Sequence, residues 1–164
     1  MLLNDLQGDY PSYFIYGPLV FTTGTMQFYA LFGNNAAALN ALSFIGNPLV
    51  TQRGAQPSAE REELVLIAAP LFPHKLSKGY GNLPAAAVYS VNGTKIRSLK
   101  HLVAVLRDLK DEFVVFEFEQ RGGETLVFPR KEMVDATEEI LNDNGVRTQG
   151  SQDMMDVWQS KKGK

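Results

Sequence analysis

Residues 88–118, VYSVNGTKIRSLKHLVAVLRDLKDEFVVFEF, decide the fold of this 164-residue chain. An alternating apolar stretch leads into Asn92-Gly93, a pair suited to a tight turn with positive φ. Ser98 can cap the helix that follows, in which apolar residues recur at helical spacing: Leu99, Leu102, Val103, Leu106 and Leu109. Residues 113–118 are rich in β-branched and aromatic side chains, as a strand is. The stretch therefore predicts strand, turn, helix and strand, an arrangement that can form one wall of a peptide-binding groove.

The length and composition predict one globular domain with additional structure at one end. Hydrophobic residues make up 45% of the chain and charged residues 21%, which is ordinary for a globular protein. The net charge of −2 argues against a general nucleic-acid binder, which needs a basic surface. The basic cluster Lys161, Lys162 and Lys164 at the end of the sequence is interpreted as a solvated tail.

Residues for catalysis or metal binding are scarce. The chain has no cysteine, which excludes disulfides, zinc–thiolate sites and cysteine nucleophiles. Its two histidines, His74 and His101, have no second histidine at metal-ligand spacing, and no serine-nucleophile motif is present. Adjacent carboxylates such as Glu138 and Glu139 point in different directions and make poor acid–base pairs. We expect no catalytic residue, no metal and no cofactor.

Neither a membrane span nor a leader is expected. No apolar run reaches the roughly 18 residues that cross a bilayer. The first ten residues, MLLNDLQGDY, lack a basic start and a long apolar stretch, so any export signal would lie upstream. A chain without cysteine fits any redox compartment, so the localisation stays open between periplasm or cytoplasm and an organelle or nucleus.

Patterns outside residues 88–118 predict further strands and helices. Residues 10–25 read as strand, Gly17-Pro18 turn and strand, and residues 26–32 as a short helix or a loop. Residues 36–44 favour a helix capped by Asn34 or Asn35, and residues 50–60 a loop. The apolar run 63–72 fits a strand buried on both faces.

The last third of the chain predicts a hairpin and two helices. Gly122-Gly123 lies between two strand-like runs, and residues 131–144 form a helical pattern that Gly145 can close. Residues 147–164 are a polar tail with a small apolar cluster. That cluster can dock a short helix on the body or on a partner, which makes its members candidates for an interface: Met154, Met155 and Trp158.

Several of these segments, in this order, resemble the C-terminal PDZ domain of Deg (HtrA-type) serine proteases, most closely the plant-type subgroup. The resemblance rests on Val91-Asn92-Gly93 with Ile96 and Ser98-Leu99, on residues 13–22 (YFIYGPLVFT), on the strand 64–68, and on Lys78-Gly79-Tyr80. It implies a domain over residues 10–146 with an insert at about 33–62, followed by the tail 147–164. The implied fold is α+β, mainly β: a partly open β-barrel capped by helices, in permuted bacterial-type strand order and with a helical insert.

The resemblance also implies a function and a site. PDZ domains bind peptides by strand addition, and a Deg-type module would serve proteolysis by binding substrate or by assembling the oligomer. The implied peptide-binding residues are a loop and strand together with three helix positions: Gly17, Pro18, Leu19, Val20, Phe21, Thr22, Leu99, Val103 and Leu106. The implied partners are peptide or protein segments, the protease domain of the same parent chain, and further copies in a homo-oligomer. Leu102, Val105 and Leu109 would then face the core, although periodicity also allows all six helix positions to be core.

One residue departs from the pattern. Pro18 removes a backbone N–H from the loop that should hold a peptide carboxylate, so an internal segment or a neighbouring subunit is an alternative occupant of the groove. Two hypotheses therefore remain: a peptide-binding module, or a structural assembly domain whose groove is filled by its own insert or tail. An independent hydrolase is a distant third, because the chain shows no catalytic set.

Overall fold

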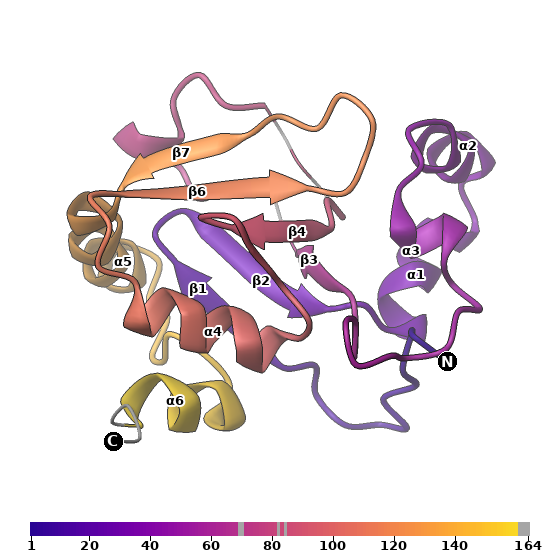
Figure 1. Ribbon diagram of the computed structural model, residues 1–164, viewed down its shortest axis with the longest axis horizontal. Helices are drawn as coiled ribbons and strands as arrows, with labels where there is room; N and C mark the ends of the chain where they lie inside the picture. The colour runs from indigo at the N-terminus through magenta and orange to yellow at the C-terminus, as the bar shows by residue number, and fades with distance from the viewer. Residues whose placement is uncertain (69–70, 82, 84, 161–164) are drawn as a thin grey trace.

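The computed structural model describes residues 1–68, 71–81, 83 and 85–160. Its strands form two antiparallel sheets, one in the order β1-β2-β3 and one in the order β5-β4-β6-β7 (Figure 1). The first sheet contains β1 (Tyr13–Tyr16), β2 (Leu19–Thr23) and β3 (Val65–Ile67). The second contains β4 (Val88–Val91), β5 (Thr94–Lys95), β6 (Phe113–Phe118) and β7 (Leu126–Pro129). The two sheets make an open rather than a closed barrel, as predicted.

The helices gather at two ends of the molecule (Figure 1). At one end lie α1 (Met26–Gly33), α2 (Ala36–Phe44) and α3 (Pro48–Thr51), the last two within the predicted insert. At the other end lie α4 (Leu99–Asp108), α5 (Arg130–Asp143) and α6 (Gln152–Gln159), and a short 3-10 helix, η1 (Lys75–Ser77), follows β3. The α+β class is confirmed, although the helices span more residues than the strands do.

The stretch 88–118 folds as its sequence predicts. Asn92 and Gly93 have φ values of 47° and 79°, the positive angles that a tight turn between β4 and β5 requires. The Ser98 hydroxyl accepts a hydrogen bond from the backbone N–H of His101 at 3.2 Å and so caps α4. The apolar face of α4 is buried against the sheets. Local chemistry is therefore sufficient to form this part of the fold.

Caps also fix the other predicted helices. Residues 26–33 are helical because the Thr25 side chain accepts from the N–H of Phe28, and Asn35 caps α2 in the same way. Gly145, with a φ of 64°, follows the end of α5 in the left-handed conformation. The apolar cluster of the tail forms α6, which packs beside α4.

Strand β3 separates two hydrophobic clusters. Val65 and Ile67 point into the large cluster between the sheets and helices α4 to α6, whereas Leu64 and Leu66 join the smaller cluster under α1. The prediction of a strand buried on both faces is thus confirmed for Val65–Ile67. The rest of the apolar run includes residues 69–70, which lie outside the described residues, as does the lysine cluster at 161–164.

Candidate peptide-binding groove

Strand β2, the predicted binding strand, has a hydrogen-bonded neighbour on each side. On one side β1 pairs with it antiparallel, from Tyr13 opposite Thr22 to Tyr16 opposite Leu19. On the other side it pairs with β3, with Phe21 opposite Ile67. A peptide that adds as a strand needs a free edge of backbone N–H and C=O groups. Such addition beside β2 therefore requires that β1 or β3 move away.

The turn between β1 and β2 has few donors left for a carboxylate. The backbone N–H of Gly17 donates to the Thr137 hydroxyl on α5 at 2.8 Å, and both residues are buried. Pro18 has no N–H to offer. β1 ends at this turn, so the chain continues through the place where the carboxylate of a peptide antiparallel to β2 would lie. The turn thus holds β1 and α5 together.

The predicted groove residues come together, but inside the core. Leu99, Val103 and Leu106 of α4 are each at most 3% exposed and share one cluster with Leu19 and Phe21 of β2. Leu102 lies in the same cluster, and Val105 and Leu109 pack at its border, so α4 does not separate a groove face from a core face. The peptide-binding role of these positions stays a prediction.

The tail supplies a contact that the sequence did not predict. Residues 149–151 run antiparallel beside the outer edge of β1, with Gly150 opposite Phe14. The N–H of Ile15 donates to the Gln149 carbonyl at 2.7 Å, and the N–H of Ser151 donates to the Tyr13 carbonyl at 3.0 Å. Residues 149–151 are polar or small and show no alternating strand pattern, and their partners lie more than a hundred residues away in the sequence. The local sequence therefore could not predict this pairing.

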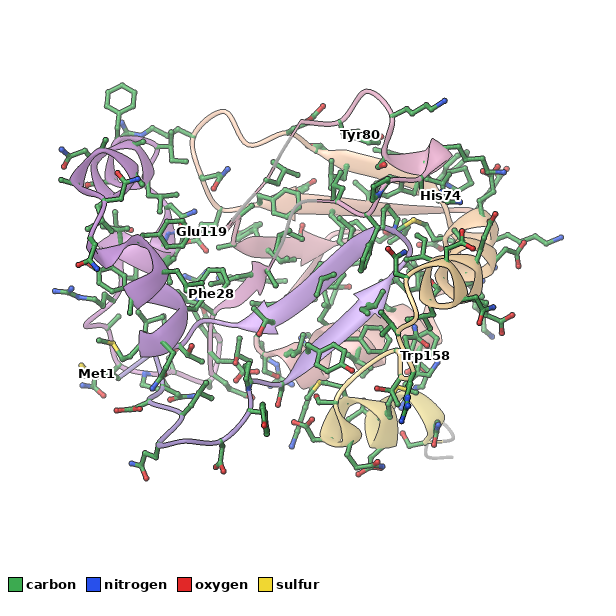
Figure 2. All side chains as sticks on the ribbon, turned by 180° about the vertical axis from the view of Figure 1, so that it is seen from behind. Met1, Phe28, His74, Tyr80, Glu119 and Trp158 are labelled. Atoms are coloured by element: carbon green, nitrogen blue, oxygen red, sulfur yellow. The ribbon has the colours of Figure 1, made fainter. Side chains whose placement is uncertain are left out.

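The three interface candidates pack on the domain itself. Met154 is 2% exposed, and Met155 and Trp158 lie partly buried against the same core cluster. The Trp158 ring lies 5.2 Å from that of Phe14 and 6.3 Å from that of Tyr16, measured between centroids. Figure 2 shows Trp158 between α6 and the β1–β2 hairpin. The tail therefore docks on the body, and an interface role for its apolar residues stays a prediction.

A sequence model of the PDZ domain family matches residues 4–153. The chain belongs to the PDZ domain family. Protease Do-like 2, a chloroplastic protein of Arabidopsis thaliana, is 27% identical to it over 153 residues, which cover 93% of this chain and 24% of that protein. The chain thus spans about a quarter of the length of this relative. The resemblance to a PDZ domain of plant Deg-type proteases is confirmed, and it supports a non-catalytic protein-interaction module.

Two further findings concern metal sites and membrane-spanning helices in the described residues. Among residues 1–68, 71–81, 83 and 85–160, no group of three or more His, Cys, Asp or Glu side chains is arranged to hold a metal ion. None of the helices in the same ranges combines the length and the apolar character that crossing a membrane requires.

A polar cavity of about 290 Å³ separates the start of α4 in this PDZ domain from the start of β1. The Glu63 carboxylate borders it and accepts a hydrogen bond from the N–H of Leu99 at 2.7 Å. Burial raises the pKa of Glu63, and this hydrogen bond only partly offsets the effect. The cavity is lined by Ser12, Thr23, Glu62, Glu63, Ser98, Lys100, Asp153 and Met154.

Asp153 joins α6 to β1. Its carboxylate accepts a hydrogen bond from the Ser12 hydroxyl at 2.6 Å. It also accepts hydrogen bonds from the Ser151 hydroxyl and from the backbone N–H of Met154. Burial by itself raises the pKa of Asp153, but these hydrogen bonds together outweigh it and hold the pKa below its ordinary value of 3.8. A lowered pKa means that the ionised carboxylate stabilises the fold.

We expect the docking of α6 to weaken in acid. The contribution of Asp153 is complete above its ordinary pKa of 3.8 and is lost as the pH falls through the lower pKa of the folded state. Trp158 is the single tryptophan of the chain, so its fluorescence reports the docking. Its emission should shift to the red in this acidic range, and Asp153→Asn should lack this acid-dependent step because it has no carboxylate to protonate at this position. Identical pH curves for the two proteins would contradict the role of Asp153.

Tyr16 offers a test of packing in β1. Its side chain is 1% exposed, and its hydroxyl makes no hydrogen bond within the part of the chain that the structure describes. Burial raises the pKa of Tyr16 to about 12. Because a buried hydroxyl without a partner is costly, Tyr16→Phe should stabilise the domain by ~1 kcal/mol in urea denaturation. A loss of stability of that size would show that the hydroxyl is satisfied.

Proposed function

We propose that this PDZ domain is a non-catalytic interaction module of a Deg-type serine protease and that it serves assembly of the parent protein rather than capture of free C-terminal peptides. The observation that carries this proposal is the pairing of β2 on both sides by strands of its own chain. A module whose binding strand is already paired contributes a fixed surface, and peptide binding would first have to displace a strand. The proposed partners are the protease domain of the same parent and further copies of the protein.

The turn at Gly17-Pro18 supports the same conclusion. A terminal carboxylate needs several converging N–H donors, and here Thr137 accepts the N–H of Gly17 while Pro18 lacks one. The related Arabidopsis protein is named as a protease. The proposal therefore includes that the parent protein of this chain is a protease. The domain itself would position or gate the protease without touching the reacting bond.

A peptide screen tests this function. Labelled peptides with diverse apolar ends are titrated into the domain in matched pairs, one with a free carboxylate and one with a C-terminal amide. We expect fluorescence anisotropy to show no saturable binding of either member at micromolar concentrations. Micromolar binding of the free acids with loss for the amides would overturn the assembly function and restore a peptide-binding groove.

A further inference from the structure

The C-terminal segment, residues 149–159, is bound to β1 in the way that a strand-adding ligand is bound. Besides the two backbone hydrogen bonds of Ile15 and Ser151, the Gln149 side chain donates to the Ile15 carbonyl at 2.9 Å. The N–H of Tyr13 donates to the Ser151 hydroxyl at 3.1 Å. Backbone groups of β1 thus bind an extended stretch of chain, which is the mode of recognition by strand addition.

The site on β1 is selective for what occupies it. A Cβ atom added to Gly150 would lie 2.9 Å from the Tyr13 carbonyl oxygen and 3.0 Å from Cδ2 of Phe14, so the position requires glycine. The residue that meets Ser12 is an acceptor, Asp153. An occupant must therefore offer a glycine followed, three residues later, by a carboxylate.

Two apolar side chains, one turn of helix apart, complete the fit. Met154 is buried in the core cluster, and Trp158 packs on the rings of Phe14 and Tyr16. Near the C-terminal end of α6, Arg107 of α4 donates to the Val157 carbonyl at 2.7 Å. An occupant of this site needs the strand, the carboxylate and the helix together. A second copy of the chain has all three, because it has the same C-terminal segment.

We propose that β1 and α4 of one copy bind the C-terminal segment of another copy, in exchange for their own segment. This inference rests on the proposed role in assembly and names the partner and the surface. Each contact described above is the same whether the segment comes from the same chain or from a second one, so exchange loses no contact within the site. The exchange links copies into a closed dimer or a larger ring.

The connection to the body permits such an exchange. Residues 144–148 join α5 to the C-terminal segment, and none of them is buried. Thr148 already contacts the Tyr13 hydroxyl, at 2.8 Å from its own hydroxyl, so only the conformation of residues 144–147 has to differ between a closed monomer and an exchanged dimer.

The length of the connection tests the exchange in the full chain. Deleting Val146 and Arg147 shortens the reach by about 7 Å, which hinders docking within one chain but not between two. We expect light scattering to show a dimer or larger closed oligomer for this variant, with the same Trp158 emission as the full chain with its segment docked. The matched variant, with Gly-Ser-Gly-Ser inserted after Arg147, should be monomeric. A shortened variant that is folded and monomeric at high concentration would overturn the proposal.

Single cysteines give an independent test that does not depend on the shortened connector. The chain has no cysteine, so a Ser12→Cys copy mixed with an Asp153→Cys copy can form a mixed disulfide only when a segment docks on another copy. We expect this heterodimer to form well above the level of a control that pairs Ser12→Cys with Asp156→Cys, because Asp156 is exposed. Formation at the control level, while a chain with both Ser12→Cys and Asp153→Cys closes internally, would overturn exchange. Peptide binding in the screen above would instead overturn the assembly function, so the two failures are distinguishable.

Discussion

Replacing Leu99 by glutamate is expected to unfold the domain rather than to alter one binding site. Leu99 is 0% exposed in the main core cluster, and its N–H already donates to the carboxylate of Glu63. A second carboxylate would be buried there without a partner of opposite charge, which should cost more than about 4 kcal/mol of unfolding free energy. Urea denaturation followed by circular dichroism measures this loss.

The control for this variant lies on the same helix. Ala104 of α4 is half-buried, so Ala104→Glu places the same carboxylate on the helix with access to water and should change stability by less than about 1 kcal/mol. If Leu99→Glu instead folded as well as the control, its side chain would face solvent in an open groove. The experiment therefore separates a core position from a groove position, which helical periodicity alone cannot do.

The parts of the fold that were predictable are those that short-range chemistry specifies. The turn at Asn92-Gly93, the Ser98 cap and the apolar face of α4 each depend on residues within one or two turns of one another. The same holds for the β1–β2 hairpin around Gly17-Pro18. Each of these features has a local reason to form, and the structure contains all of them.

The candidate site was only partly predictable, because its state depends on long-range pairing. The pattern of residues 13–22 predicts two strands and a turn, but not that β3 would take the second edge of β2 across the insert. The pairing of Gly150 with Phe14 joins residues 136 positions apart and leaves no periodic trace in the sequence. In the local sequence, only Pro18 indicated that the turn would bind the terminal carboxylate of a peptide poorly, because proline has no backbone N–H.

Replacing Gly17 by alanine should be the most damaging change in the β1–β2 turn. Gly17 has a φ of 55°, a left-handed angle that costs a residue with a Cβ roughly 1–2 kcal/mol. The added Cβ would also lie 2.5 Å from the Met133 sulfur of α5, so the buried thioether would have to move. Overpacking of this kind costs about 1–3 kcal/mol, which together with the backbone cost gives an expected total of about 2–5 kcal/mol in urea denaturation.

Gly145→Ala separates the two causes. Gly145 has a similar φ of 64°, but a Cβ there would meet no heavy atom of the described residues within 4 Å, so this variant should lose only the backbone part. The difference between the two variants then measures the contact between the turn and α5. Equal losses would mean that α5 does not pack tightly on Gly17, and the hydrogen bond from Gly17 to Thr137 would no longer be a reason to exclude a carboxylate from the turn.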